Sequence, residues 1–379
     1  MAGAVTESAI ARGLEGVIAT RSSLSAIDGL AGRLMYRGYD IHDLAREATY
    51  AEAVYLLWND ELPDRTQLQA FELELSAHRA LDEATLDILA RLPTDASPMA
   101  ALRTGVSALG AFDAEPEDDS PDANRRRAVR LVAALPTIIA AFQRRRSGRE
   151  PMAPDGELSH AANFLYMVSG ERPEEEVAGA LDKTLLLYLD HGLNASTFTC
   201  RIIASTLSDM YSAITGGIGA LKGPLHGGAN AKAMEMLLEI GEPARVGAYV
   251  DEALGRKKKI MGFGHRVYKV EDPRATHLRE MSRELCERAG ERKWYEISRQ
   301  LEELMRERKD LYPNVDFYCG SVYYALGLPT DLYTPLFAMG RVGGWTAHVM
   351  EQFSDNRLIR PRAEYVGETD RQWVSLDDR

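Results

Sequence analysis

Apolar positions recur with the period of an α-helix along most of the chain. Thr49 is suited to cap one helix, and Pro63-Asp64 opens the next. Further helical patterns are predicted near residues 82–92, 98–110, 125–145, 158–169, 174–190, 196–221, 229–240, 275–289, 292–308, 319–327 and 342–354. Alternating runs of β-branched residues are nearly absent. The pattern therefore predicts an all-α fold.

Two stretches stand out from this pattern. Within residues 14–38, Ile27-Asp28-Gly29 and Ala31-Gly32 predict the turn of a short hairpin. The helix predicted at 196–221 is apolar around most of its circumference. Such a helix is expected in the centre of a large core or, alternatively, in a dimer interface.

Residues 112–127 are acidic and contain two prolines, so we expect an exposed linker there. The arginines at 125–127 and 144–146 flank the next helix. We expect them to be solvated helix ends, with a phosphate-binding role as the alternative.

The chain has 379 residues, which favours two domains over a single core. Its net charge of −12 disfavours non-specific binding to nucleic acids or anionic membranes. The first residues lack the features of a signal peptide, and no apolar stretch reaches the length of a membrane span. We therefore expect a cytoplasmic protein.

Cys200, Cys286 and Cys319 form no C-x-x-C pair and are expected to be reduced thiols.

Five of the eight histidines have ordinary helical contexts, and we expect surface residues or satisfied core residues: His42, His78, His160, His277 and His348. His348 and Glu351 share the spacing of a metal-binding pair. No second pair accompanies them, so no metal site is predicted.

The other three histidines lie in glycine-rich breaks between helices: His191 in DHGLNAST, His226 in GPLHGGANA and His265 in MGFGHRVY. Glycine lets the backbone bend sharply and lets a ligand approach closely. Asp316, in YPNVDFYCG, lies in a similar break. Neighbouring aromatic residues would desolvate its carboxylate and make it a better base, although it could also simply cap a helix.

Positive charge is concentrated between residues 256 and 274, where seven basic side chains face two acidic ones. This stretch is either a solvated face or a site for an anionic ligand with phosphates. Arg341 and Arg360 add planar guanidinium groups suited to carboxylates.

The segments GPLHGGAN, MGFGHRVYK-x-x-DPRA and NVDFYCG, in this order, resemble the citrate synthase family. So do ARGLEGV, YRGYDIHDLA, SHAANFLYM, HGLNASTF, GWTAHVMEQ and RLIRPRAEYVG. The resemblance runs from about residue 12 to residue 367. The length of the chain is similar to that of the shorter, dimeric bacterial and archaeal form.

The resemblance implies a citrate synthase-like homodimer with two helical domains. Residues 1–229 and 331–379 would form the large domain, and residues 230–330 the smaller inserted one. The active site would lie in the cleft between the domains.

The resemblance also implies the site residues. The catalytic residues would be His226, His265 and Asp316. The oxaloacetate ligands would be His191, Arg274, Arg341 and, supplied across the dimer, Arg360. The CoA-binding residues would be Lys257, Lys258, Lys259, Ile260, Gly262, Gly264 and Lys269. Acetyl-CoA and oxaloacetate would be the substrates, with no metal and no further cofactor.

Three other functions remain open from the sequence. A 2-methylcitrate synthase would use propionyl-CoA on the same fold, and one methyl group changes binding by only about 1–3 kcal/mol. The segment Asp272-Pro273-Arg274 resembles the citrate form, since the methylcitrate form has a serine before this arginine. The second function is that of a non-catalytic helical scaffold. The third is that of a metal-dependent hydrolase that uses the three histidines.

Overall fold

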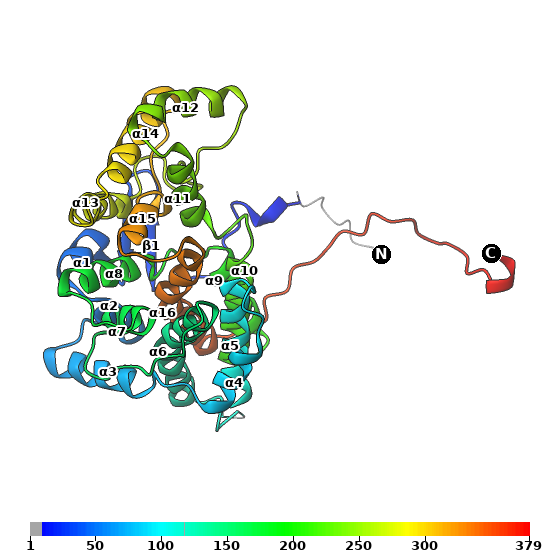
Figure 1. Ribbon diagram of the computed structural model, residues 1–379. Coiled ribbons are helices and arrows are strands. Elements are labelled where there is room, and N and C mark those ends of the chain that lie inside the picture. Colours follow the sequence, from blue (N-terminus) through cyan, green and yellow to red (C-terminus); the bar gives the residue numbers. More distant parts are fainter. Residues whose placement is uncertain (1–9, 117) are drawn as a thin grey trace.

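The structure is a computed structural model that describes residues 10–116 and 118–379. Its described residues form α-helices joined by short loops, with one small antiparallel sheet (Figure 1). The prediction of an all-α fold is therefore confirmed.

A first group of helices makes up the lower part of Figure 1. It consists of α1 (Ile41–Glu47), α2 (Tyr50–Asn59), α3 (Arg65–Ala77), α4 (Glu83–Arg91), α5 (Pro98–Ala111), α6 (Pro121–Arg146), α7 (His160–Ser169), α8 (Glu175–Tyr188), α9 (Ala195–Ser205), α10 (Met210–Leu221) and α16 (Tyr333–Ser354). The long helices α6 and α16 lie at its centre, and α16 contacts α2, α6, α8, α9 and α10. Because α16 is surrounded on all sides, even its polar residues Arg341, Thr346 and His348 are buried.

A second group lies at the upper end of Figure 1. It consists of α11 (Ala229–Ile240), α12 (Val246–Gly255), α13 (Pro273–Arg288), α14 (Lys293–Lys309) and α15 (Val315–Ala325). Its helices pack chiefly on one another, and α13 also contacts α1 and α8 of the first group. Single 3₁₀ turns complete the structure at Arg12–Leu14, Pro243–Arg245, Thr330–Leu332 and Leu376–Asp378.

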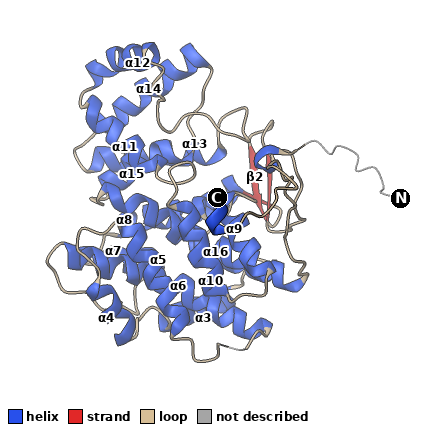
Figure 2. Cartoon of the chain, turned by 90° about the vertical axis from the view of Figure 1, so that its right-hand side faces the viewer, coloured by secondary structure: helices blue, strands red, loops and turns tan. Residues whose placement is uncertain are grey.

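The sheet has the order β1-β2-β3, with β1 (Ser25–Asp28), β2 (Arg33–Tyr36) and β3 (Tyr39–Asp40). Ser25 pairs with Tyr36 and Asp28 pairs with Arg33, so the chain turns between Asp28 and Arg33. The predicted hairpin is confirmed. Figure 2 shows the strands at one edge of the molecule.

Both predicted helix starts are confirmed by capping contacts. Thr49 accepts a hydrogen bond from the amide of Glu52, and the Glu52 carboxylate accepts one from the amide of Thr49. Asp64 and Gln67 make the same reciprocal pair at the start of α3. These contacts satisfy amides that have no partner inside the helix.

The prediction of one helix over residues 196–221 is wrong. The chain forms α9 and α10 instead, with Leu207 in a left-handed conformation (φ 63°) between them. Asp209 caps α10 by accepting from the amide of Ser212 at 2.8 Å. The apolar period continues across this cap, and for that reason the pattern does not reveal the break. Most of the apolar side chains are buried, but Ile202 and Leu207 are exposed.

The expectation for residues 112–127 also needs correction, because α6 already begins at Pro121. The guanidinium of Arg127 is only 3% exposed and forms an ion pair with Asp113 at 2.7 Å. It also donates to the carbonyl oxygens of Glu115 and Asp118. Arg127 is thus not a solvated helix end; it holds the acidic loop against α6.

Four further features differ from the predictions. The short helices α1 and α12 were not expected, α15 begins at Val315 rather than 319, and α16 begins at Tyr333 rather than 342. All three cysteines are free and buried. Within the described residues, no helix is long and apolar enough to cross a membrane.

Candidate active site

His226 lies in the turn between α10 and α11, at a position fixed by the start of α9. The backbone amide of Ser196 donates to Nε2 of His226 at 3.2 Å, and the Ser196 hydroxyl lies 2.8 Å from the same atom. A backbone amide can only donate, so Nε2 is the acceptor and the ring proton resides on Nδ1. Burial, assisted by the charge of Arg341, lowers the pKa of His226 to about 4. At neutral pH the ring is an uncharged donor.

His265 has the opposite arrangement of its ring proton. The amides of Val267 and Tyr268 both donate to Nδ1, at 3.0 and 3.3 Å. The proton of the neutral ring is therefore on Nε2. Burial and the nearby charge of Arg274 lower the pKa of His265 to about 4. The two histidines thus offer an Nδ1–H and an Nε2–H without carrying charge.

Asp316 is the second residue of α15. Asn314, not Asp316, caps this helix, because the Asn314 side chain accepts from the amide of Asp316 at 3.0 Å. The carboxylate of Asp316 therefore does not accept the capping hydrogen bond of this helix. Burial raises its pKa to about 6, and the charges of Arg274 and Arg341 oppose that rise. The desolvated carboxylate predicted from the sequence is present.

The loops that carry His265 and Asp316 are joined by backbone pairing. Asn314 donates its amide to the carbonyl of Gly262, and Gly264 donates to Tyr312, each at 2.9 Å. Gly262 has φ 81°, and a Cβ there would lie 2.7 Å from Cβ of Phe317. Glycine is needed at this point because the two loops touch.

Two buried arginines lie at the same site. Arg274, at the start of α13, donates from Nε and Nη2 to the carboxylate of Asp272, at 3.0 and 2.8 Å. Arg341, in α16, donates from Nε to the carbonyl of Tyr188 at 2.5 Å. Among the described residues, no hydrogen bond is made by Nη1 of Arg274 or by either Nη group of Arg341. Burial lowers the pKa of Arg341 to about 10, so it remains a cation at neutral pH.

His191 lies in the turn between α8 and α9. Its ring centre is 5.2 Å from that of His265, and Nε2 lies 3.2 Å from the hydroxyl of Tyr268. Burial and the cations Arg274 and Arg341 lower its pKa well below the usual value. The charge of Arg341 acts on the pKa values of His191, His226 and Asp316, so all three groups lie within electrostatic range of this guanidinium.

The preceding residue, Asp190, is fully buried and supports this turn. His348 lies 3.1 Å from its Oδ1, and the amide of Gly192 donates to its Oδ2 at 3.2 Å. Arg201 donates from Nε to Nδ1 of His348 at 3.2 Å. His348 is therefore a satisfied core residue, as expected. Glu351, its suggested metal-binding partner, pairs with Arg201 instead.

Arg360 does not join this cluster within one chain. It is exposed, and the neighbouring amide of Ile359 donates to the Ser205 hydroxyl at the last residue of α9. The candidate catalytic residue His226 contacts the first turn of the same helix. The eleven residues of α9 span about 15 Å, so the segment of Arg360 and the ring of His226 contact opposite ends of this helix.

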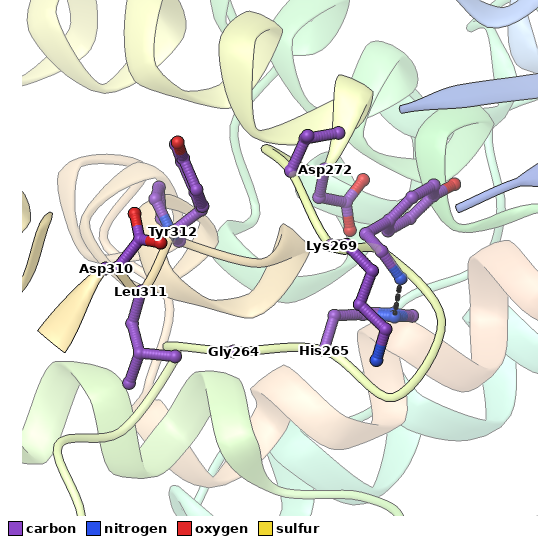
Figure 3. Close-up of a pocket in the computed structure, with 10 residues that line it drawn as sticks. Gly264, His265, Lys269, Asp272, Asp310, Leu311 and Tyr312 are labelled. Carbon is purple, nitrogen blue, oxygen red and sulfur yellow. Dashed lines mark hydrogen bonds between the residues drawn. The ribbon is translucent and has the colours of Figure 1, made fainter. Parts of the chain in front are cut away.

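The predicted CoA-binding residues lie along the loop that leads to His265. Lys257, Lys258, Lys259 and Lys269 are exposed, whereas Ile260 and Gly262 are buried. Gly264 and Lys269 line a pocket of about 210 Å³ beside His265 (Figure 3). Figure 3 shows Asp310, Leu311 and Tyr312 on the side of the pocket opposite His265 and Lys269.

Comparison with known proteins gives one consistent result. The family described as "Citrate synthase, C-terminal domain" matches residues 13–362. A citrate synthase of Haloferax volcanii is 53% identical, over 97% of this chain and 98% of its own. The chain belongs to the citrate synthase family. A 2-methylcitrate synthase of Corynebacterium glutamicum is 43% identical, over 99% of this chain and all of its own.

The fold supports the same family. A citrate synthase of Thermoplasma acidophilum, solved as a ternary complex with carboxymethyl coenzyme A and oxaloacetate, superimposes with a TM-score of 0.92. It is 35% identical, with coverage of 98% of this chain and 99% of that one.

Sequence reasoning missed four residues of this citrate synthase-family site. Asp190 and Ser196 flank His191 in the DHGLNAST segment, and Tyr268 follows His265 by three positions. Their nearness to candidate histidines was the available signal. The sequence contains no such signal for Arg201, because this residue lies in an apolar helix and contacts His348 only in the folded chain.

Proposed function

We propose that this chain condenses acetyl-CoA with oxaloacetate and, with water, releases citrate and CoA. The proposal rests above all on the two neutral imidazoles, which hold their protons on opposite ring nitrogens, and on the Asp316 carboxylate of raised pKa, which follows the loop paired with the loop of His265. This set can take a proton from carbon and supply one proton to each of two oxygens. His226, His265 and Asp316 are the proposed catalytic residues.

In the first step, Asp316 takes a proton from the methyl group of the thioester. A carboxylate with a pKa near 6 is a stronger base than an ordinary aspartate and is still ionised at pH 7. Nδ1–H of His226 donates to the thioester oxygen as negative charge develops there. The product of this step is the enol of acetyl-CoA.

In the second step, the enol carbon forms a bond to the ketone carbon of oxaloacetate, and the enol oxygen returns its proton to Nδ1 of His226 as the thioester carbonyl forms again. The ketone oxygen takes the proton from Nε2 of His265 and becomes the hydroxyl of a citryl thioester. Water then cleaves the thioester and releases CoA, and the proton that Asp316 took replaces the one lost by His265. Each proton given up by a histidine has a defined nitrogen as its source, because the amides of Ser196, Val267 and Tyr268 fix both tautomers.

Oxaloacetate would be held by its two carboxylates. The Nη groups of Arg274 and Arg341 that make no hydrogen bond within the described residues are suited to them, and His191 would donate a further hydrogen bond. Binding in one orientation places the ketone beside the enol and lowers the entropic part of the barrier. These interactions use side chains of the protein alone and call for no metal or additional cofactor.

The remaining oxaloacetate ligand would be Arg360 of the partner subunit in a homodimer. Its exposed position near the end of α9, away from His226, supports this arrangement. After Ser354 the chain leaves the helical body and ends far from it (Figure 1). Its exposed apolar side chains, which include Tyr365, Val366 and Trp373, would then be covered by the second subunit.

The two groups of helices support a division into a large domain (1–229 and 331–379) and a small one (230–330). His265, Arg274 and Asp316 would come from the small domain, and His191, His226 and Arg341 from the large one. CoA would approach along the exposed lysines 257–259 and Lys269, with its thioester end beside His265. Backbone atoms from Ile260 to Gly264 would then face the adenine. Closure of the cleft would exclude water from the enol.

The test is a comparison of kcat/KM for acetyl-CoA and propionyl-CoA with oxaloacetate as the second substrate. We expect acetyl-CoA to be preferred. A preference for propionyl-CoA would instead identify a 2-methylcitrate synthase, the activity for which the C. glutamicum relative is named. Absence of product from either thioester would refute the proposal in favour of a scaffold. Loss of activity after exhaustive chelation would favour a metal-dependent enzyme.

A further inference from the structure

The turn between β1 and β2 has no part in the reaction described above, yet it contacts the loop that carries His265. The amide of Lys269 donates to the carbonyl of Gly29 at 2.9 Å. Asp28 holds the turn in shape, since its Oδ1 accepts from the amides of Leu30 and Ala31 at 3.0 and 2.9 Å. A turn of the small sheet, held in shape by Asp28, thus meets the loop before α13 that carries His265.

The contact leaves no room for a side chain at Gly29 or Gly32. A Cβ on Gly29 would lie 2.3 Å from the carbonyl oxygen of Val267, where real Cβ atoms essentially never approach closer than 3.0 Å. A Cβ on Gly32 would lie 2.8 Å from Cγ2 of Val270. Gly29 does not have a positive φ, so its requirement for glycine is one of space rather than backbone conformation.

The atoms that Gly29 touches are directly linked to those that orient His265. The carbonyl of Val267 and the amide of Tyr268 belong to one planar peptide group. That amide donates to Nδ1 of His265, and the amide of Val267 donates to the same atom. If a side chain at position 29 pushed the carbonyl away, the peptide would tilt and the hydrogen bond to the imidazole would be lost.

The other end of this loop is already held. Gly264 donates its amide to Tyr312 at 2.9 Å, and the Asn314 side chain donates to the carbonyl of Gly264 at 3.0 Å. These contacts fix His265 relative to Asp316. On the other side of His265, the loop is held by the hairpin turn and by the contact of Tyr268 with His191.

We propose that the β1–β2 turn, residues 28–32, is a positioning element for His265, acting through the Val267–Tyr268 peptide to keep the ring proton on Nε2. This rests on the proposed function, in which Nε2–H protonates the ketone of oxaloacetate. Gly29 and Gly32 are positioning residues, since neither touches the reacting atoms.

The first test is Gly29→Ala, with Gly179→Ala as the matched control. A Cβ on Gly179, an exposed residue of α8, has no atom within 4 Å. We expect kcat of Gly29→Ala to fall about 10- to 100-fold, the size of effect that a small misplacement of a catalytic group produces. KM for oxaloacetate should stay within about twofold, since the arginines are untouched. Gly179→Ala should keep the wild-type kcat and the wild-type KM for oxaloacetate.

A spectroscopic readout separates positioning from general damage. In protein labelled with ¹⁵N-histidine, Nδ1 of His265 should show the chemical shift of an unprotonated nitrogen, assigned with His265→Gln. Gly29→Ala should move this signal toward that of a mixture of tautomers, and Gly179→Ala should not. An unchanged signal, or an unchanged kcat, would overturn the inference.

A second pair of variants covers the case in which Gly29→Ala does not fold. Asparagine tolerates the positive φ of Gly32 (65°), so Gly32→Asn mainly adds the clash with Val270. We expect Gly32→Asn to lower kcat and the double variant with Val270→Ala to recover most of it. Failure of that recovery with both proteins folded would contradict the inference. If instead the unmodified chain condenses neither acyl-CoA, the proposed function fails, whatever these variants show.

Discussion

The oxaloacetate ligands proposed here come from two regions that are built in opposite ways. His191 rests on a buried network in which Asp190, His348 and Arg201 satisfy one another. Arg360 lies in the segment after α16, where residues 360–370 are exposed and no helix or strand is formed. The first region is complete within one chain, whereas under the proposed function the second would need the partner subunit.

The difference in burial between these two regions suggests different roles in the proposed binding of oxaloacetate. A buried ionic group must have its partners in place as soon as the chain folds, because an unpaired charge in the interior is strongly destabilising. The inner half of the site is therefore preorganised. In the proposed dimer, the exposed Arg360 would have no such desolvation penalty before the second subunit binds, so the outer half of the site could depend on assembly.

The largest expected effect is inside the inner region, at the proposed base. Asp316→Ala should lower kcat by about 10²- to 10⁴-fold, since a general base contributes that much. Oxaloacetate binding should survive and can be measured by calorimetry. Asp331→Ala, which removes an exposed carboxylate paired with Arg146, is the control and should keep normal turnover. A near-normal kcat in Asp316→Ala would exclude this residue as the base.

The next prediction concerns Asp190, which supports the turn that carries His191. Asp190→Ala should lower the free energy of unfolding by about 3–5 kcal/mol, as expected when one member of a buried charged network is lost. Burial alone would raise the pKa of Asp190, but His348, Arg341 and Ser25 hold it at about 2, so the group is ionised at neutral pH. Denaturant unfolding of Asp190→Ala and wild type gives the difference. A change of about 0.5 kcal/mol or less, the usual size for surface substitutions, would show that the network does not stabilise the turn.

Much of this inner region could be predicted from sequence because its chemistry sits where the helical pattern breaks. Glycines beside His226 and His265, and Pro313-Asn314 before α15, indicate local turns that can be located in the sequence. The hairpin and the caps at Thr49 and Asp64 were predictable for the same reason. Each depends on residues only a few positions apart.

The support of the site could not be predicted, since its partners are distant in sequence. Asp190 and His348 are separated by 158 positions, and Arg201 and His348 by 147. Arg127 was misjudged for a related reason: an arginine near a helix end looks solvated until the fold brings acidic and carbonyl oxygens around it. Local patterns show where the chain turns, but not which buried charges will meet.

The outer region is tested by Arg360→Ala, which should weaken oxaloacetate binding. Loss of one charge-assisted contact costs about 1.5–3 kcal/mol, or roughly 10- to 150-fold in affinity.

Complementation between two variants distinguishes the two regions. A mixed dimer of Arg360→Ala with Arg274→Ala contains one site with both arginines and one with neither, so an equal mixture should recover about a quarter of the wild-type sites. No recovery in verified mixed dimers would mean that Arg360 acts within its own chain or not at all.

The smallest expected effect is the dependence of activity on pH. Asp316 must be ionised to act as a base, and burial has raised its pKa to about 6. The value of kcat should therefore fall as the pH decreases below 6, by about tenfold for each further unit. Since Arg274 opposes the rise in pKa, Arg274→Ala should move this acid limb to higher pH, whereas Arg146→Ala, at an exposed ion pair, should leave it in place.

Stability should respond with the opposite sign. The folded protein binds the Asp316 proton more tightly than the unfolded chain, whose aspartates titrate near 3.8. The contribution of this proton to stability is complete below pH 3.8 and is lost as the pH rises through 6. Asp316→Asn, which is uncharged at every pH, should thus gain stability over wild type above pH 6 while losing turnover. If its stability advantage did not grow between pH 4 and pH 7, the carboxylate would not be desolvated, and its special basicity would have no physical source.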